Sequence, residues 1–119
     1  MNLGKKTWVF CDGDLPPAGN SEPFAHEAMM VVNNSDKVAN LKITLLFEDK
    51  EPKENIALTV EPKRVRCIRM DMPLGEEGFK IPFGQFAVIL ESDVEVVAVY
   101  GRLDRRPDMA YYPVQGYGV

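Results

Sequence analysis

The sequence predicts an all-β protein, an antiparallel β-sandwich that is jelly-roll-like, and three observations carry that prediction. Apolar residues recur mostly with the two-residue period of a strand, and helical spacing is weak throughout. Turn-forming Gly, Pro, Asn and Asp separate these apolar runs at short intervals. The result is about seven short strands, a pattern typical of sandwiches and jelly rolls.

The size of the chain fits one domain. It has 119 residues, of which 45% are hydrophobic, so it can bury a core of its own. We expect a single β-sandwich domain over residues 1–106 and an extended C-terminal tail over 107–119, where Pro, Gly and Tyr accumulate.

Charge and cysteine content restrict the compartment and the partners. The net charge is −4, and an acidic balance argues against nucleic acid as a partner. The apolar runs are too short for a signal peptide or a bilayer span, so a cytoplasmic protein is expected. Without a secretory signal, Cys11 and Cys67 are expected to be free and buried.

The first half of the chain holds three predicted strands. Residues 7–11 form a β-rich run that the turn signal at 12–14 closes. Residues 27–33 are apolar on both faces, as in a strand that is covered on both sides. Residues 38–48 show the clearest alternation. The inward face of that strand carries Leu41, Ile43, Leu45 and Phe47.

Four more strands are predicted in the rest of the chain. Residues 55–60 alternate, and residues 63–70 form a basic strand. The last two strands are predicted at 86–91 and 94–103, joined by a turn at 92–93. One face of the basic strand carries Val65, Cys67 and Arg69, and the other carries Arg64, Arg66 and Ile68.

The single histidine is the first candidate for chemistry. His26 is followed by Glu27, and an imidazole beside a carboxylate can do acid–base work or begin a metal site. Neighbours on a strand point to opposite faces, so these two cannot share a pocket without a bulge. Zinc usually takes three or four ligands, and no ligand spacing exists here, so no metal site is expected and a hydrogen-bonded structural histidine is favoured.

A polar series near the end of the last strand is the second candidate. Tyr100, Arg102 and Asp104 alternate along the chain and therefore share one strand face. This face can bind sugar hydroxyls or a carboxylate, with the ring stacking and the guanidinium forming a bidentate contact. The alternative, equally supported, is an internal or intersubunit ladder of ion pairs.

Two single residues complete the candidates. Arg69 follows apolar residues on its face, so a semi-buried position with an acidic partner is expected, supplied by Asp71, Asp104 or Glu27. Trp8, the only tryptophan, offers a stacking face for a ligand, although a core aromatic is the more common role.

Apolar residues at outward strand positions indicate self-association. Such residues lie on otherwise polar faces, and tyrosines in the tail are suited to close a pocket or pack on a neighbouring subunit. The outward apolar residues are Leu46, Ile68 and Met70, and the tail tyrosines are Tyr111, Tyr112 and Tyr117.

A series of short segments identifies a family by its order and spacing. The segments are Trp8, the loop 13–20, His26-Glu27, Val32-Asn33, Ala39, Ile43-Thr44, the corner 49–52, residues 58–60, Arg64, Arg69, the segment 91–94 and Arg102-Leu103-Asp104. On these residues the chain resembles the Anabaena sensory rhodopsin transducer family, up to about Arg106, and the tail beyond departs from it.

The resemblance implies a soluble, jelly-roll-like β-sandwich that assembles as a homotetramer. It also implies a membrane receptor as a partner, because the named member serves a photosensory rhodopsin. The wider family looks like a set of small-molecule-binding domains for sugars or related metabolites, and DNA binding has been proposed for the transducer.

These observations support three hypotheses. The first is a non-enzymatic binding or sensing domain for a small polar ligand, without a cofactor. Its predicted ligand-binding residues are Trp8, His26, Glu27, Arg69, Tyr100, Arg102 and Asp104. The second is a protein–protein adaptor for a membrane receptor, in which the polar residues are structural. The last is a sugar-processing enzyme or a DNA-binding regulator, which the single histidine and the acidic charge disfavour.

Overall fold

The fold is an antiparallel array of eight β-strands that is bent into two layers. It is described from a computed structural model for residues 3–106 and 108–119. The strands are β1 (Lys5–Asp14), β2 (His26–Asn33), β3 (Ala39–Phe47), β4 (Lys53–Val60), β5 (Arg64–Arg69), β6 (Gln85–Asp104), β7 (Ala110–Val114) and β8 (Gly116–Gly118). The predicted all-β class and antiparallel pairing are confirmed. The jelly-roll connection stays a prediction.

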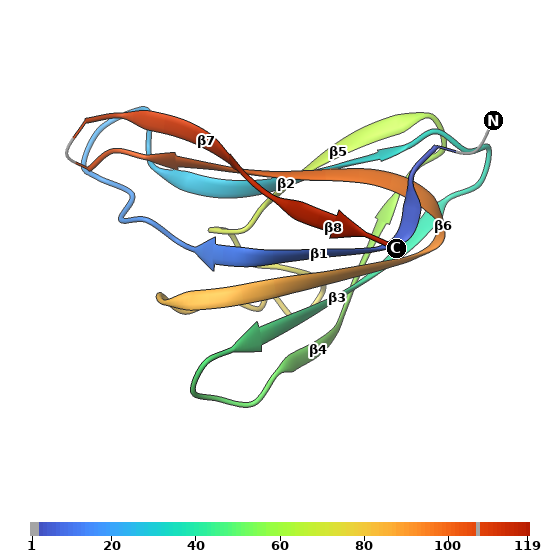
Figure 1. The fold of residues 1–119 in the computed structure, drawn as a ribbon, viewed down its shortest axis with the longest axis horizontal. Helices are drawn as coiled ribbons and strands as arrows, with labels where there is room; N and C mark the ends of the chain where they lie inside the picture. Colours follow the sequence, from blue (N-terminus) through green and yellow to red (C-terminus); the bar gives the residue numbers. More distant parts are fainter. Residues whose placement is uncertain (1–2, 107) are drawn as a thin grey trace.

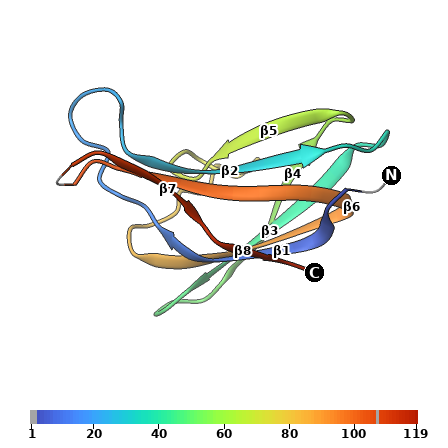
Figure 2. The ribbon, with the colours of Figure 1, turned by 45° about the horizontal axis from the view of Figure 1, so that its top comes forward.

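Strand β6 belongs to both layers. Its first half pairs with β1 and β3, and its second half pairs with β2 and β7 (Figure 1). Layer A therefore has the order β4-β3-β6-β1-β8, and layer B has the order β5-β2-β6-β7. The view in Figure 2 shows the two layers facing each other, with β6 crossing from one to the other.

The core lies between the layers and follows the predicted alternation. Leu41, Ile43 and Leu45 of β3 are at most 2% exposed, because a pleated strand sends alternate side chains to one face. The facing side of layer B contributes Met29 and Val31 of β2, which are fully buried. The inward face of β3 was therefore predicted correctly, whereas β2 was expected to be covered on both sides and its outward Val32 is 39% exposed.

The predicted turn at residues 92–93 is wrong, because β6 runs through it as one strand of 20 residues. The polar side chains serve the crossing between layers instead. The Asp93 carboxylate accepts the backbone N–H and the side-chain Nδ2 of Asn40, both at 2.8 Å. Ser92 Oγ accepts the N–H of Val94 at 3.3 Å. Local side-chain acceptors of this kind are common in turns, which is why the sequence pattern misled.

The turn signal at 12–14 also lies inside a strand, since β1 extends to Asp14. The register of β1 against β6 shifts between Phe10 and Gly13, as in a β-bulge. An added Cβ at Gly13 would lie 2.4 Å from the Phe86 ring, so the glycine permits close packing of the two strands.

Three further expectations about burial are wrong. Cys11 and Cys67 are free, as predicted, but exposed rather than buried. Ile68 and Met70 are 5% and 0% exposed and belong to the core, so they form no outward apolar surface. Leu46 remains exposed at the surface. Ile68 was placed outside because the alternation alone does not say which face of β5 is covered.

The C-terminal segment is extended, and it pairs with both layers. Residue 107, the start of the predicted tail, lies outside the described residues. Beyond it, β7 pairs with β6 in layer B, and β8 pairs with β1 in layer A. The segment thus spans the side of the sandwich opposite β4 and β5. No helix in the described part of the chain is long and apolar enough to cross a membrane.

Candidate functional site

A buried carboxylate lies at the centre of the polar residues. Glu27 points inward from β2 and is fully buried. Its Oε1 accepts the Tyr100 hydroxyl at 2.6 Å, and its Oε2 accepts Arg102 Nε at 2.5 Å. The backbone N–H of Asp14 donates to the same Oε2 at 3.0 Å. Three donors from β1 and β6 therefore satisfy one carboxylate, as burial of a charge requires.

Arg102 connects this carboxylate to two further strands. Its Nη2 donates to the backbone carbonyl of Asp12 at 2.6 Å, and its Nη1 donates to the Tyr112 hydroxyl at 3.2 Å. The guanidinium carbon also lies 5.4 Å from the centroid of the Tyr112 ring, within range of a cation–π contact. We call Asp12, Asp14, Glu27, Tyr100, Arg102 and Tyr112 the Glu27–Arg102 network.

The pKa values of two residues in the network are raised, for different reasons. Burial, followed by the charge of Glu27 and the hydrogen bond to it, raises the pKa of Tyr100 far above its ordinary value. Burial alone would lower the pKa of Arg102, but its hydrogen bonds to Tyr112 and Glu27 raise it overall. Tyr100 therefore remains a neutral donor and Arg102 a cation over the physiological range.

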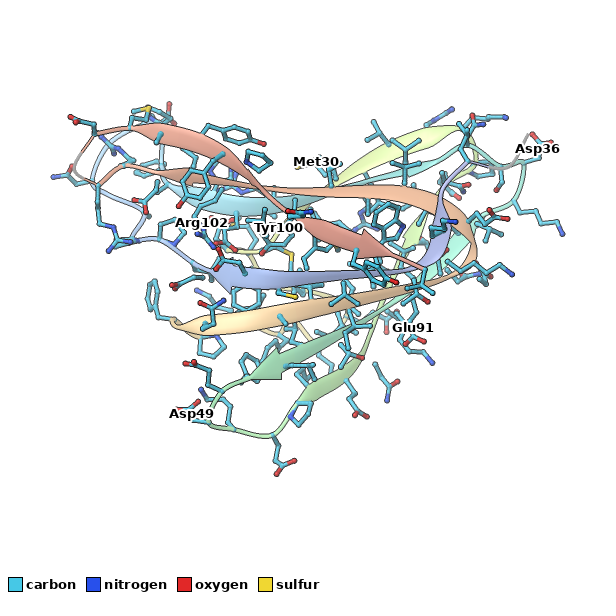
Figure 3. All side chains as sticks on the ribbon, in the orientation of Figure 1. Met30, Asp36, Asp49, Glu91, Tyr100 and Arg102 are labelled. Carbon is cyan, nitrogen blue, oxygen red and sulfur yellow. The ribbon has the colours of Figure 1, made fainter. Side chains whose placement is uncertain are left out.

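The network is closed on itself. Figure 3 shows Tyr100 and Arg102 in the space between the layers. Among the described residues, no buried side-chain nitrogen or oxygen lacks a hydrogen-bond partner. The donors that a ligand would need are already used by Glu27, Asp12 and Tyr112. This arrangement holds four strands together, and it matches the ion-pair alternative for the polar face of β6.

Three of the seven predicted site residues meet in this network, and Asp104 does not join them. Glu27, Tyr100 and Arg102 are bonded to one another. Asp104 follows on the same strand, but its carboxylate accepts the backbone N–H of Arg106 at 3.0 Å and its Nε at 3.3 Å. The hydrogen bond from the Arg106 side chain lowers the pKa of Asp104.

Arg69 and His26 lie together on the other face of layer B. Arg69 makes a bidentate pair with Asp71 at 2.8 and 2.7 Å, which selects one of the three predicted partners. The hydrogen bond to Asp71 raises the pKa of Arg69. His26 Nδ1 lies 2.8 Å from the carbonyl of Phe24 and donates to it. His26 and Glu27 therefore point to opposite faces, as strand geometry predicted.

Trp8 is separated from both groups. Its Nε1 donates to the carbonyl of Val96 at 3.0 Å, where β6 changes layer. Its ring stacks on Phe10 with centroids 6.4 Å apart and planes 8° apart. These contacts correspond to the packing role rather than to a free stacking face.

Three members of the network were not among the predicted site residues. Asp12 and Asp14 were assigned to a turn, and they join the network chiefly through backbone groups, the carbonyl of Asp12 and the N–H of Asp14. Tyr112 had been expected to close a pocket or to contact a neighbouring subunit, and it covers Arg102 instead. The sequence did contain one signal for these residues. Arg102 lies on a strand face that was expected to be buried, and a buried guanidinium needs carboxylate or carbonyl acceptors around it.

A groove separates the edges of β4 and β5, where the two layers are open. Its main hollow has a volume of about 600 Å³. The hollow is lined by Asn40, Leu41, residues 57–59 of β4, residues 66–69 of β5 and residues 72–76 of the following loop. Arg66 crosses the groove, and its Nη1 donates to the carbonyl of Thr59 at 2.7 Å. We call this feature the β4–β5 groove.

The outside of layer B carries a group of apolar side chains, with Arg69 on the same face beside Ala28. Val65 and Tyr111 are each 65% exposed and Val99 is 54% exposed, and Figure 3 labels Met30 on the same outward side. The register places them on one face. This layer B face consists of Met30, Val32, Val65, Cys67, Val97, Val99, Leu103 and Tyr111.

These features define the class of the protein: an all-β domain with a closed internal polar network, an open groove and an apolar outer face. No group of three or more potential metal-ligating residues occurs within residues 3–106 and 108–119. A family model described as Anabaena sensory rhodopsin transducer matches residues 3–118. The chain belongs to that family, and the match includes the C-terminal segment that the sequence motifs had set apart.

Two solved structures are similar over most of their length. The crystal structure of Thermotoga maritima 1070 has a TM-score of 0.85 and 28% identity, covering 100% of this chain and 97% of that one. The Anabaena sensory rhodopsin transducer has a TM-score of 0.76 and 34% identity, covering 89% of this chain and 94% of that one. No curated protein sequence matches this chain.

Proposed function

We propose that this protein is a non-enzymatic, cytoplasmic binding domain that transmits signals through protein contacts, with its buried polar residues serving the fold. One observation carries the proposal: the carboxylate of Glu27 is fully buried and receives three donors from its own chain. A group used in this way is a structural element rather than a free ligand site. The relative named for a sensory rhodopsin supports a membrane receptor as the partner.

Self-association through the layer B face is part of this proposal, and we infer a homotetramer as the working form. Exposed, contiguous apolar side chains on a sheet face are typical of surfaces that a partner covers. Val65 and Val99 lie on neighbouring rows of that face. The outer face of layer A differs, because Lys42 and Glu91 lie opposite each other on it.

Light scattering tests the assembly directly. Val99→Asp places a charge on the layer B face and should dissociate the oligomer, because an unpaired buried charge is costly. Leu46→Asp is the matched control, since Leu46 is also exposed but lies on the outside of layer A. An unchanged oligomer in Val99→Asp, or equal dissociation in both variants, would remove the layer B face from the proposal.

A small polar ligand such as a sugar is the second candidate, favoured by the hollow of the β4–β5 groove. Arg69 is one of the seven predicted ligand-binding residues, and it lines that hollow. Asn40 and Thr59, which were not predicted, add further polar groups. A ligand at one hundred times its Kd would stabilise the protein by about 2.7 kcal/mol. A thermal-shift screen of sugars and metabolites, repeated with Arg69→Gln and Arg102→Ala, would show a ligand and distinguish the groove from the network.

A further inference from the structure

The β4–β5 groove is bordered by two strand edges whose backbone groups face it. The N–H of Met70 donates to the carbonyl of Glu27 at 2.9 Å. Residues of an antiparallel strand alternate between bonding the neighbour and pointing away from it. The alternation therefore directs the N–H and C=O groups of Val65, Cys67 and Arg69 to the free edge of β5.

The opposite edge shows the same alternation. The carbonyl of Thr59 receives Arg66 from across the groove, so it points away from β3 and into the opening. Ala57, two residues earlier, has the same orientation. Free strand edges are templates for an added strand, and extended peptides use them through main-chain hydrogen bonds.

The hollows along β4 adjoin one another and make the groove long. The main hollow of about 600 Å³ shares Thr59 and Arg66 with one of about 350 Å³, and it shares Ala57 and Leu74 with one of about 220 Å³. Together they follow β4 over residues 55–61. An elongated space beside a strand of six residues suits an extended chain better than a compact metabolite.

The charge of the groove selects an acidic occupant. Arg64 and Arg66 alternate on β5, and neither takes part in an ion pair within the described residues. Arg64 donates only to the carbonyl of Lys63 in its own strand region, at 3.0 Å. Glu61, Glu76 and Glu77 also line the hollows, and Glu77 is paired with Lys53. The negative charge therefore lies after β4 and in the loop after β5, whereas the positive charge lies on β5 itself.

We propose that the β4–β5 groove binds an extended peptide that adds a strand to β5 and carries carboxylates at alternate positions. Alternate side chains on a strand are roughly 7 Å apart, so two acids separated by one residue face Arg64 and Arg66 together. A third alternate position faces Ile68 and takes an apolar side chain. Arg66 would exchange the Thr59 carbonyl for a carboxylate, which is the stronger acceptor.

The same arginines exclude other strands. Charged side chains on an edge strand discourage pairing with uncharged or basic strands, because their charges would lose water without a partner. Two acids separated by one residue therefore attract the peptide to the groove and also distinguish it from uncharged or basic strands. This inference rests on the proposed adaptor function and names the chemistry of its partner.

Fluorescence anisotropy with a labelled peptide tests the proposal. In the probe, a valine and two glutamates occupy every second position, and threonines occupy the positions between them. The matched peptide has glutamines in place of the glutamates. We expect saturable binding of the glutamate peptide, at least about fivefold tighter than the glutamine peptide and weakened by salt. A third peptide, N-methylated on alternate amides so that it cannot pair with an edge, should lose binding.

Variants of the protein locate the site. Arg64→Gln and Arg66→Gln should each weaken binding about fivefold, whereas Lys42→Gln on the outside of layer A should leave it unchanged. Cys67→Pro removes an edge N–H without touching the bonds to β2, and Cys67→Ala keeps that N–H as its control. N-methylated peptides make the same test on the unaltered protein if the proline variant does not fold.

Three results would overturn the proposal. These are equal binding of the glutamate and glutamine peptides, equal binding of the N-methylated peptide, or the absence of saturable binding by the glutamate peptide. A failure of this kind leaves the oligomer test with Val99→Asp unaffected, so the docking site and the proposed assembly through the layer B face can fail separately.

Discussion

The two open sides of the sandwich are treated differently in this molecule. On one side, β7 and β8 run along layer B and then layer A, so a single C-terminal segment pairs with both edges. On the other side, β4 and β5 end the two layers without a further strand in the described residues. The first side encloses the Glu27–Arg102 network, and the second leaves the β4–β5 groove.

The burial and bonding of two arginines, one on each side, illustrate this difference. Arg102, on the closed side, is 7% exposed, donates hydrogen bonds to Glu27, Asp12 and Tyr112, and lies over the Tyr112 ring. Arg66, on the open side, is exposed and makes one hydrogen bond to a backbone carbonyl. The same residue type on the same fold is therefore buried and fully hydrogen-bonded in one place and exposed with a single hydrogen bond in the other.

The largest expected effect is on the closed side. Arg102→Ala leaves the carboxylate of Glu27 buried without its cation, so we expect a loss of about 3–5 kcal/mol in the free energy of unfolding. Urea unfolding at a fixed protein concentration measures it. Adding Glu27→Gln to Arg102→Ala should recover part of the loss, because the buried charge is removed. A loss below about 1 kcal/mol would contradict the structural role of the network.

The next effect concerns how closely the C-terminal segment approaches layer A. A Cβ added at Gly116 would lie 2.3 Å from Cε1 of Phe10, whose ring is 1% exposed. Gly116→Val should therefore cost about 1–3 kcal/mol through overpacking. Gln115→Val, at the exposed neighbouring residue, is the control and should be close to neutral. Equal stability of the two variants would mean that β8 is not held tightly on β1.

Ionisation of Tyr100 should lower the stability of the folded protein at alkaline pH. Its pKa in the folded protein is raised above the ordinary value of 10.0, so its stabilising contribution is complete below about pH 10 and is lost as the pH rises further. The loss should be at most about 1.4 kcal/mol per pH unit. Phenolate absorbance should show that Tyr100 ionises only when the protein unfolds, and Tyr100→Phe should remove this part of the pH dependence.

The smallest effect is expected on the open side. Arg66→Ala should change the free energy of unfolding by no more than about 0.5 kcal/mol, because its one hydrogen bond is exposed to solvent. Chemical denaturation beside Arg102→Ala gives the comparison in one experiment. A cost similar to that of Arg102→Ala would show that both sides are structural and would remove the contrast between them.

The strands were largely predictable, because their periodicity is a local property. Residues of β3 alternate except at Leu46, and β2 is apolar on both faces since the layer B face is apolar too. The single strand β6 was not predictable, since Ser92 and Asp93 have the chemistry of a turn and act as side-chain acceptors at a layer crossing. Only the pairing partners reveal that the chain continues.

The candidate site was predictable in part for a related reason. The spacing of Tyr100 and Arg102 placed them on one face, and their burial with Glu27 follows from the need to pair a buried charge. The groove was not predictable, because it depends on which strands end each layer. Tyr112 shows the same limit, since its contact with Arg102 depends on the pairing of β7 with β6.

The double role of β6 also affects how the chain acquires its structure during synthesis. β1 ends at Asp14 and finds its partners only in β6 and β8, so residues 15–84 must be made before the β1 edge can be covered. Until then β2 has only β5, and β3 has only β4. Pairing across such long separations is slow, because the loop must close before any contact is formed. Before β6 is made, the chain can form at most the β2–β5 and β3–β4 pairs, and we expect the joining of both layers to wait for β6.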